Sequence, residues 1–399
     1  MASSDSTQNL NIIRKKTETV RIAIDASTIS TQGGPRTYVL GLIDALLRID
    51  KVNEYIVFYN DPVHLGRFPL ATEVVLPGKN PLARLWREHV LLPLACRRER
   101  VDVLHCPKSA IPYFMPCPVV VTLHDLIPLK HPETEKFAAQ MYWRLQIPIA
   151  ARRSSFIITD SEHARQEILE DFDCPPEKVK AIMLGFDPLM NKLREAADGD
   201  KICLKYGLPS EYLLYVGTIQ PRKNLDTLIQ AFSRLKRSGS VDHKLVIVGR
   251  KGWLYERLFA DIREMNLESE IIFTGFVPDE ELPFIYDRAR VFLYLSLFEG
   301  FGLPPLEAMA CGIPVITSNT TSLPEVVGDA GITVNPTDIG AVELALKQVL
   351  SDPTLATRMK EAGRSRARLF SWDATARQTL EIYQQIYKKG KGELLKRTP

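Results

Sequence analysis

Short β-rich runs alternate with helical stretches along most of this chain, and the alternation begins twice. The first series starts at RIAID (21–25), passes through a glycine-containing turn into the apolar-periodic TYVLGLIDALLRI (37–49), and returns to a strand at YIVFYN (55–60). A strand, a helix and a second strand in this order are typical of a parallel sheet. The second series starts at YLLYVGT (212–218). The sequence therefore predicts an α/β chain with two Rossmann-like, doubly wound domains.

Both series contain further runs that are typical of buried strands. The first continues with TEVVL (72–76), DVLHC (102–106), PVVVTLHD (118–125) and FIITDS (156–161), and the second with KLVIVG (244–249), IIFTGF (271–276), VFLYLS (291–296) and PVITS (314–318). Helices are expected at 225–236, at 304–311 and, with no strand after it, at about 373–389. The chain has 399 residues, which exceeds what one hydrophobic core usually fills, so two domains imply a cleft between them.

The domain boundary is expected between 185 and 210, where proline, glycine and charge are mixed. We therefore divide the chain into a flexible polar tail (1–19), an N-terminal acceptor-side domain (20–188), a C-terminal domain (189–372) and a terminal helix (373–399) that packs back on the N-terminal domain.

Charge and cysteine content argue against several classes of protein. The 51 Lys and Arg against 48 Asp and Glu give a formal charge of +3, too small for a general nucleic-acid binder. The six cysteines form no C-x-x-C pair, which argues against a disulfide framework or a zinc site and fits a reducing cytoplasm. No secretory signal and no run of roughly 20 apolar residues is seen. We expect a cytoplasmic protein that is not integral to a membrane.

The segment 84–100 interleaves arginines with apolar residues. The arginines are Arg84, Arg87, Arg97, Arg98 and Arg100, and the apolar residues around them are Leu82, Leu85, Trp86, Val90, Leu91 and Leu92. We interpret the segment as a surface helix that packs its apolar face on its own sheet, with Pro93 interrupting the pattern. The alternative is peripheral contact with an anionic membrane surface.

Two segments of the first series are candidate ligand sites. The paired glycines Gly33 and Gly34 lie between a strand and a helix that should begin near Pro35, where backbone N–H groups can approach an anion. A tight turn needs glycine for steric reasons as well. His124 and Asp125 follow a buried run and should lie at the carboxyl end of a parallel strand, where open α/β sheets bind ligands.

The second series brings two cations to a helix N-terminus. In GTIQPRKNL, which begins at Gly217, Arg222 and Lys223 precede the helix that starts near Asp226. Cations are disfavoured at this positive end of the helix dipole, so an anion should compensate them. A diphosphate is a suitable candidate because arginine supplies a planar donor fork and lysine a compact charge.

The segment EGFGLPPLE (299–307) has two carboxylates around a glycine-rich turn. Glu299 should lie on the loop and accept hydrogen bonds from sugar hydroxyls. Glu307 is expected in the first helical turn, positioned to accept from a ribose, while the N–H groups of Gly302 and Leu303 face phosphates. A capping role for Glu307 and a solvated role for Glu299 would not explain this combination of glycine, proline and acid.

Taken together, the Gly-Gly turn, the His-Asp pair, G-T-x-x-P-R-K-N-L and E-x7-E occur in the order found in retaining glycosyltransferases of family 4, which have the GT-B fold. The chain resembles that family from about Arg21 to Lys389. The resemblance implies that Arg222 and Lys223 bind a donor diphosphate and that Glu307 binds the ribose. Pro35 departs from the small or polar residues of the family's glycine loop.

The same resemblance implies further roles. Glu299 would hold the transferred sugar, His124 would approach the reaction centre, and the Gly33 loop would close over the diphosphate or the acceptor. Weaker nucleobase candidates lie in 249–251 and 276–278, namely Arg250, Lys251 and Val277. The resemblance also implies retention of anomeric configuration without a cofactor or an essential metal, and the chain shows no D-x-D motif in a plausible phosphate loop. Front-face attack is the mechanism we favour over a covalent intermediate.

The sequence around His124 looks most like bacterial mannosyltransferases that use GDP-mannose, so mannose transfer to a saccharide or polyprenyl-linked acceptor is our leading hypothesis. UDP-glucose is the main alternative donor. Sugar-nucleotide epimerases, phosphorylases and a non-catalytic sugar-nucleotide-binding protein stay as alternative functions. A nicotinamide-dependent oxidoreductase should carry G-x-G-x-x-G after its first strand, and this fingerprint is absent. The acceptor and the oligomeric state are not readable from the residues.

Overall fold

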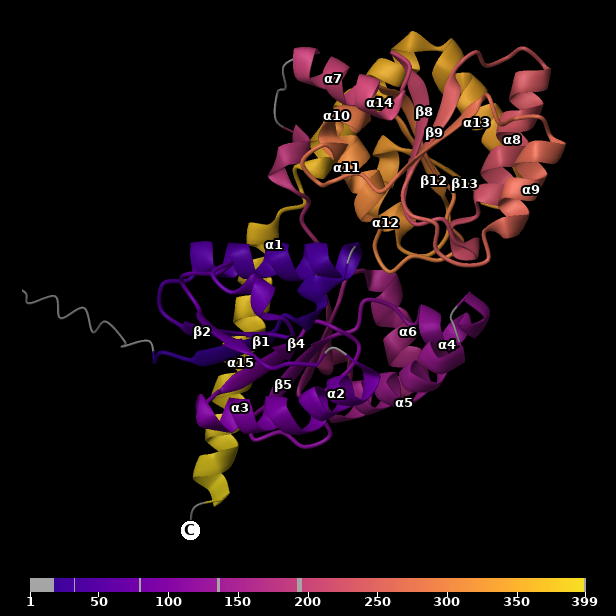
Figure 1. Cartoon of the computed structure of the whole chain (residues 1–399). Coiled ribbons are helices and arrows are strands. Elements are labelled where there is room, and N and C mark those ends of the chain that lie inside the picture. The colour runs from indigo at the N-terminus through magenta and orange to yellow at the C-terminus, as the bar shows by residue number, and fades with distance from the viewer. Residues whose placement is uncertain (1–17, 32, 79, 135–136, 192–195, 398–399) are drawn as a thin grey trace, which may run out of the picture.

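The computed structural model describes residues 18–31, 33–78, 80–134, 137–191 and 196–397. Figure 1 shows two α/β domains, with the C-terminal domain above the N-terminal one and the final helix running from the upper domain along the lower one. Most of the predicted polar tail, residues 1–17, lies outside the described residues, as do Gln32 in the glycine turn, 192–195 in the predicted boundary segment and 398–399 in the terminal helix.

Within these ranges the N-terminal sheet has seven parallel strands in the order β3-β2-β1-β4-β5-β6-β7. The strands are β1 (Arg21–Asp25), β2 (Glu54–Tyr59), β3 (Thr72–Val75), β4 (Val103–Cys106), β5 (Val119–Thr122), β6 (Phe156–Thr159) and β7 (Val179–Ala181). The helices are α1 (Gly34–Ile49), α2 (Pro81–Trp86), α3 (Leu92–Arg98), α4 (Ile127–Lys130), α5 (Phe137–Arg153) and α6 (Glu162–Phe172). Strands β4, β5 and β6 are buried along their whole length, as their apolar runs predicted.

The C-terminal sheet, counted over the same ranges, has six parallel strands in the order β10-β9-β8-β11-β12-β13. The strands are β8 (Tyr212–Val216), β9 (Lys244–Val248), β10 (Ile271–Gly275), β11 (Ala289–Tyr294), β12 (Val315–Ser318) and β13 (Ile332–Val334). The helices are α7 (Ala196–Tyr206), α8 (Leu225–Arg237), α9 (Glu256–Glu264), α10 (Leu282–Asp287), α11 (Leu303–Cys311), α12 (Leu323–Val327), α13 (Ile339–Ser351), α14 (Pro353–Ala367) and α15 (Trp372–Arg397). The three-residue strands β7 and β13 were not predicted.

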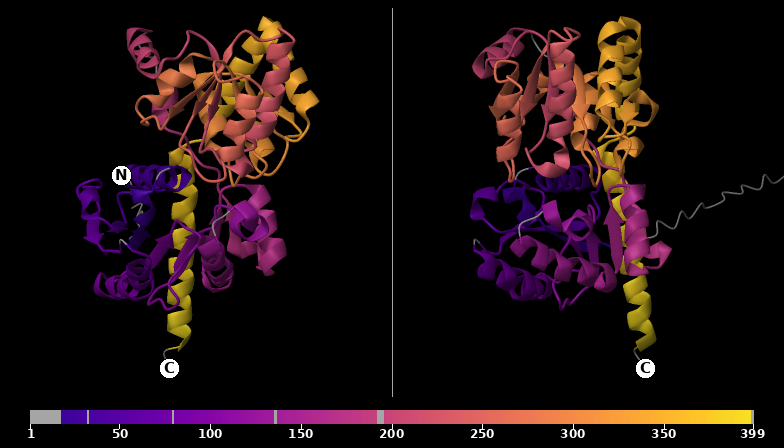
Figure 2. Two further views of the ribbon diagram at one scale, coloured as in Figure 1. Left: turned by 45° about the vertical axis from the view of Figure 1, so that its right-hand side comes forward. Right: turned by 90° about the vertical axis from the view of Figure 1, so that its right-hand side faces the viewer.

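Short 3-10 turns complete the chain. They are η1 (Ser27–Ser30), η2 (Pro62–His64), η4 (Pro132–Thr134), η5 (Pro176–Lys178), η6 (Pro188–Asn191), η7 (Pro221–Lys223) and η8 (Gly328–Ala330). Helix α15 leaves the C-terminal domain and packs against α1, β4 and β6 of the N-terminal domain, as both views of Figure 2 show. The second crossing between the domains is made by the segment around η6. These two crossings hold the sheets with their carboxyl edges on either side of a shared cleft.

The segment 84–100 differs from the prediction in two respects. The π-helix η3 (Arg87–Leu91) joins α2 to α3, so the helical backbone continues through Pro93, which occupies the first turn of α3. Arg87 is buried and pairs with Asp25 at the end of β1 at 2.5 Å, so it does not contribute to a basic surface. The prediction that Arg87 belongs to such a surface was wrong, because the carboxylate that holds it lies 62 residues away in the sequence.

Candidate functional site

The strand orders place the predicted loops at or next to the point where the strand order of each sheet reverses, between β1 and β4 in one domain and between β8 and β11 in the other. In the C-terminal domain β8 and β11 are neighbours, and their carboxyl ends lead into Gly217–Asn224 and into Leu295–Gly302. In the N-terminal domain β1 leads into the glycine turn, and β5 leads into His124 and Asp125. Ligands of open α/β sheets bind at such switch points. The fold therefore directs the predicted residues of both domains toward one cleft.

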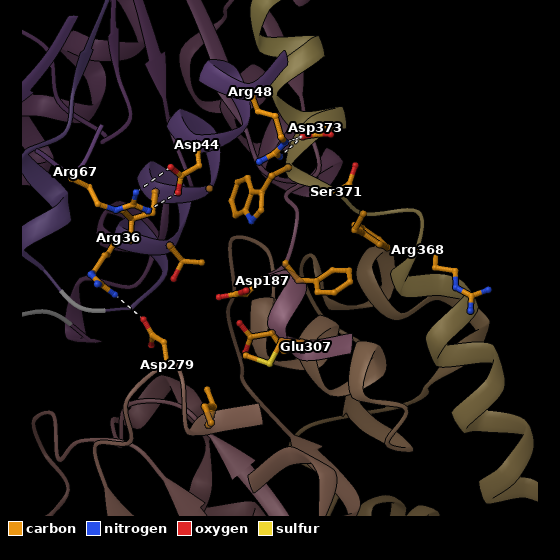
Figure 3. A pocket seen from close by; sticks show the side chains of 18 residues that line it. Arg36, Asp44, Arg48, Arg67, Asp187, Asp279, Glu307, Arg368, Ser371 and Asp373 are labelled. Carbon is orange, nitrogen blue, oxygen red and sulfur yellow. Dashed lines mark hydrogen bonds and ion pairs between the residues drawn. The ribbon is translucent and has the colours of Figure 1, made fainter. Parts of the chain in front are cut away.

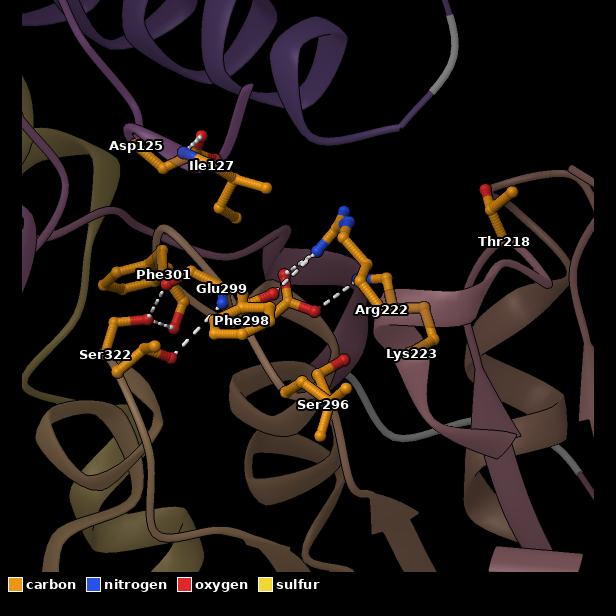
Figure 4. A network of polar contacts seen from close by, with 12 residues as sticks. Asp125, Ile127, Thr218, Arg222, Lys223, Ser296, Phe298, Glu299, Phe301 and Ser322 are labelled. Atoms are coloured by element: carbon orange, nitrogen blue, oxygen red, sulfur yellow. Dashed lines mark hydrogen bonds and ion pairs between the residues drawn. The ribbon is translucent and has the colours of Figure 1, made fainter. Parts of the chain in front are cut away.

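Glu299 is the centre of a buried ionic cluster in the C-terminal domain (Figure 4). Its carboxylate accepts a hydrogen bond from the Lys223 ammonium and lies 3.0 Å from Nη1 of Arg222. The hydroxyl of Tyr294 donates to the same carboxylate at 3.0 Å, and it lies 2.5 Å from Nζ of Lys223. Only 9% of the Glu299 side chain and 7% of the Lys223 side chain are exposed. The anion that compensates the two cations in this structure is thus a carboxylate of the chain itself.

The cluster shifts the pKa values of its members in opposite directions. Burial alone would raise the pKa of Glu299, but the charges of Arg222 and Lys223 outweigh burial and lower it to about 2. Burial and then the charge of Arg222 lower the pKa of Lys223 to about 8, although Glu299 opposes them. The carboxylate is therefore ionised at every physiological pH, whereas Lys223 loses its proton in mildly alkaline solution.

His124 is held by a carboxylate that the sequence reasoning missed. Asp160, just after β6, accepts a hydrogen bond from Nδ1 of His124 at 2.7 Å and is itself buried. Burial would lower the pKa of His124, but the Asp160 charge outweighs burial and raises it. Asp160 follows a buried strand in the segment FIITDS, and that position at a sheet edge was the signal available in the sequence.

The two halves of the site touch at Gly300. A Cβ atom built on Gly300 would lie 2.5 Å from the carbonyl oxygen of His124 and 3.1 Å from Oδ2 of Asp125. Next to this contact, the ring of Phe298 stacks on His131, with ring centroids 3.3 Å apart. The loop that carries Glu299 therefore lies directly against the turn that carries His124, and glycine is the residue that permits this approach.

Glu307 faces a separate part of the cleft, a cavity of about 560 Å³ between α1, α11 and the segment before α15 (Figure 3). Burial raises the pKa of Glu307 to about 8, and the charges of Asp279 and Asp187 add to this effect, while a hydrogen bond from Tyr286 at 3.1 Å opposes it. The prediction that Glu307 lies in the first helical turn was wrong. Helix α11 begins at Leu303, so Glu307 is in its second turn.

The start of α11 explains this difference. Gly302 is the N-cap and has φ of 120°, a conformation that side chains rarely adopt, and a Cβ there would lie 2.7 Å from Leu323. Pro304 and Pro305 then occupy the first turn, where their missing N–H groups cost no hydrogen bonds. The N–H groups of Gly302 and Leu303 are at the helix N-terminus, where the sequence reasoning expected them.

Helix α1, which follows the glycine turn, forms the opposite wall of the same cavity from Arg36 onward. Gly33 is the N-cap of α1 with φ of 94°, and neither it nor Gly34 has an atom within 4 Å of an added Cβ. Two residues further on, Arg36 reaches across the cleft to Asp279 of the C-terminal domain at 2.7 Å. The helix N-terminus thus borders open space, with one arginine bridging the domains.

The candidate nucleobase residues follow β9 and β10. The guanidinium of Arg250 lies 4.6 Å from the ring centre of Phe276, and the ammonium of Lys251 lies 4.4 Å from that of Phe259. The side chain of Val277 is buried in the hydrophobic core, so a base can meet only its backbone. Gly217 is joined to the β9 strand by a hydrogen bond from its N–H to the Val248 carbonyl, which places the two loops side by side.

In the part of the chain that the structure describes, no three His, Cys, Asp or Glu side chains are grouped so that they could hold a metal ion. All six cysteines are described, and all are free thiols. None of the described helices combines the length and the apolar character that a bilayer-spanning segment needs.

Comparison with known proteins gives the following matches. The family model described as Glycosyltransferase Family 4 matches residues 32–188, and the model described as Glycosyl transferases group 1 matches residues 205–366. O-antigen chain mannosyltransferase B of Escherichia coli is 35% identical over 293 residues, which cover 73% of this chain and 76% of that protein. Glycogen synthase of Mycobacterium tuberculosis is 30% identical over 299 residues, which cover 72% of this chain and 69% of that protein.

Among solved structures, sucrose-phosphate synthase of Thermosynechococcus elongatus superposes with a TM-score of 0.76. The alignment covers 93% of this chain and all of that chain at 22% identity, so it supports the two-domain fold and nothing more specific.

Proposed function

The chain belongs to the group 1 glycosyltransferases of family 4, and from this membership we propose that it transfers mannose from GDP-mannose to a saccharide acceptor with retention of anomeric configuration. The observation that carries the choice of mannose is the 35% identity to O-antigen chain mannosyltransferase B over three quarters of both chains. The buried cluster of Glu299, Arg222 and Lys223 opposite His124 supplies groups that suit such a transfer.

In this proposal the donor diphosphate takes over Arg222 and Lys223. A diphosphate carries more negative charge than one carboxylate and accepts the planar donor fork of arginine, so it competes for both cations. Glu299, released from them, accepts hydrogen bonds from hydroxyls of the mannose ring. Glu307 accepts from the ribose, and the N–H groups of Gly302 and Leu303 meet phosphate oxygens at the start of α11.

The transfer itself is proposed as a front-face displacement. The acceptor hydroxyl forms a bond to C1 of the sugar while the bond from C1 to the phosphate oxygen breaks, and the acceptor proton passes to that departing oxygen. Arg222 and Lys223 stabilise the charge that develops on the leaving diphosphate, which is the task a metal ion performs in other transferases. We propose that no metal and no further cofactor is needed, with the imidazole of His124 hydrogen-bonded to the sugar near C1.

A second candidate is glucosyl transfer from UDP-glucose. The match to glycogen synthase, at 30% identity over 72% of this chain, favours glucose as the transferred sugar and does not identify the nucleotide. The two candidates share the diphosphate and ribose contacts and differ in the base and the sugar. They are therefore separated by ligand preference rather than by the ionic cluster.

The first experiment is a thermal-shift screen with GDP, UDP, ADP, dTDP and their sugar conjugates, each with and without EDTA. A ligand that binds only the folded state raises the melting temperature by mass action. A selective response to GDP and GDP-mannose in EDTA supports the proposal, and a selective UDP response transfers it to the glucosyl candidate. No response to any nucleotide contradicts both. The responding donor is then tested for transfer of a radiolabelled sugar to saccharide and polyprenyl-linked acceptors.

The acceptor side carries an apolar surface that suits a membrane-bound acceptor. On α2 and α3 the exposed residues include Leu82, Leu85, Trp86 and Leu94, and on α5 they include Phe137, Met141 and Leu145. The guanidinium of Arg84 lies 5.5 Å from the ring centre of Tyr142 on α5, so the two groups of helices are adjacent. We propose peripheral contact with anionic lipid through this surface, although Arg87 takes no part in it.

The membrane proposal is tested by co-sedimentation with vesicles of phosphatidylglycerol and of phosphatidylcholine. Trp86→Glu should reduce binding to the anionic vesicles while leaving sugar transfer to a water-soluble acceptor unchanged. Equal sedimentation of the wild type with both lipids, or none with either, contradicts the proposal.

A further inference from the structure

A carboxylate of the C-terminal domain caps a helix of the N-terminal domain. Glu325, in the single turn of α12, accepts hydrogen bonds from the backbone N–H groups of Glu162 at 2.8 Å and His163 at 2.7 Å. These are the first two residues of α6. The third N–H, that of Ala164, is bound by the side chain of Ser161 within the N-terminal domain. Of these three N–H groups at the start of α6, two are therefore bound by the other domain and one by its own.

This arrangement depends on the distance between the domains. The first N–H groups of a helix have no partner within the helix, and they favour negative charge. Two charge-assisted hydrogen bonds to one carboxylate satisfy them well, but only while α12 stays against α6. In Figure 1, α12 lies at the lower rim of the C-terminal domain, above α6. The contact can exist only while the two domains are this close together.

The two residues before α12 form hydrogen bonds with the loop that carries Glu299. The hydroxyl of Ser322 donates to the carbonyl oxygens of Glu299 at 2.9 Å and Phe301 at 2.7 Å (Figure 4). The hydroxyl of Thr321 accepts from the N–H of Glu299 at 3.2 Å. Thr321 itself has φ of 53°, which is strained for a β-branched residue and is kept only where surrounding contacts enforce it. The segment 321–325 thus binds the loop that carries Glu299 through its first two residues and α6 through its last.

Helix α12 is fixed within its own domain. Arg366 of α14 donates from Nη2 to the carbonyl of Glu325 at 2.6 Å and from Nε to the carbonyl of Val326 at 3.1 Å. Because the carbonyl end of α12 is fixed in this way, a change in the distance between Glu325 and α6 requires movement of the whole domain. The contact with α6 therefore depends on the same domain arrangement that brings Gly300 against His124.

We propose that Glu325 is a positioning residue for glycosyl transfer, because its cap on α6 holds the domains in the closed arrangement that sets the Glu299 loop against the His124 turn. The inference rests on the proposed function. A helix-terminal charge interaction with its hydrogen bonds changes an equilibrium by about 5- to 30-fold, and we expect the ratio of closed to open molecules to fall by that factor when the cap is removed.

The test compares Glu325→Ala, Glu325→Gln and Glu325→Asp in the full-length protein. Glu162→Gln is the control, since it removes one carboxylate from the same interface but leaves the N–H group that Glu325 binds. In Glu325→Ala, hydrogen exchange of the α6 amides at 162 and 163 should accelerate about 5- to 30-fold. The kcat for sugar transfer should fall by up to the same factor, while GDP affinity and melting temperature stay at wild-type values. Gln and Asp should rescue part of the rate, and the control should match the wild type.

The outcomes separate the inference from the function on which it rests. Unchanged exchange at the start of α6 overturns the cap, and faster exchange with unchanged kcat overturns its role in transfer. A fall of several degrees in melting temperature, or a loss of GDP affinity by the same factor as kcat, also overturns it, because such a pattern indicates general damage. Absence of sugar transfer by the wild type contradicts the proposed function, while the exchange measurement still decides whether the cap exists.

Discussion

Replacing Gly300 by alanine should separate the two halves of the site without disturbing either domain. The new Cβ would lie 2.5 Å from the His124 carbonyl oxygen, whereas ordinary contacts begin at 3.4 Å. The obstructing atom belongs to the backbone, so no side-chain rotation relieves the contact. Gly300 is not among the residues with positive φ, and alanine can therefore adopt its conformation. The protein should respond by opening the cleft by about 1 Å at this point.

Such a displacement should lower the rate of sugar transfer. A misplacement of about 1 Å between reacting groups can reduce a rate about 10²-fold, which corresponds to about 2.7 kcal/mol in the activation free energy. GDP should bind with nearly wild-type affinity, because Arg222, Lys223 and Glu307 all belong to the C-terminal domain. The melting temperature should fall by no more than a few degrees, since domain opening relieves the contact without unfolding.

The assay measures kcat for radiolabelled sugar transfer, GDP affinity by calorimetry and the melting temperature of the same preparation. Gly340→Ala is the matched control, because it makes the same change at an exposed position of α13, where the nearest atom to the new Cβ is 3.4 Å away. Full kcat in Gly300→Ala would refute the reasoning. Loss of kcat accompanied by loss of GDP affinity would also refute it, since the C-terminal domain would then be distorted.

Three further predictions follow from the buried charges. Burial and a neighbouring guanidinium lower the pKa of Lys223 to about 8, so GDP affinity should fall as the pH rises through 8. The titration is done in a Glu307→Gln background, because Glu307 also has a pKa of about 8. In calorimetric titrations Lys223→Arg should abolish the decrease. Arg87→Met removes the guanidinium from the buried carboxylate at the end of β1 but leaves it Lys108 at 3.1 Å, so urea denaturation should show a loss of about 1–3 kcal/mol in unfolding free energy. In Asp160→Asn the pKa of His124 should move to lower pH in an NMR titration, and the stability that protonated His124 gives in wild type below its raised pKa should be lost; an unshifted titration would exclude Asp160 as the partner.

The sheets were predictable because their strands are continuous apolar runs, and a run that is buried on both faces has few alternatives in an α/β chain. Strands β7 (VKA) and β13 (ITV) escaped prediction because each has three residues and only part of each is buried. Pairing with β6 and β12 makes them strands, and that pairing is a tertiary contact.

The site was predictable as a set of loops but not as a set of contacts. Each loop follows a strand, so its position at a sheet edge can be read locally. The partner of each charge cannot, since Arg222 and Glu299 are 77 positions apart and Glu325 caps a helix 163 positions away. Helix α11 was predicted to begin at 304 and begins at Leu303. The helix begins directly after Gly302, whose positive φ ends the loop, and the sequence shows this only as a glycine.

The pairing of Glu299 with both cations leads to one further prediction with an unexpected sign. If the proposed donor site is correct, a nucleotide diphosphate must displace the buried carboxylate of Glu299 from the two cations, and the released carboxylate then needs sugar hydroxyls as new partners. GDP alone supplies none, whereas GDP-mannose does. Glu299→Gln removes the competing charge, so GDP should bind about tenfold more tightly than to wild type, in line with the difference between charged and neutral hydrogen bonds. The same variant should transfer mannose more slowly, because the amide is a weaker acceptor for the sugar hydroxyls. Calorimetry with GDP and rate measurements with GDP-mannose test these two expectations. Weaker GDP binding by Glu299→Gln would show that the carboxylate aligns Arg222 and Lys223 for the diphosphate rather than competing with it.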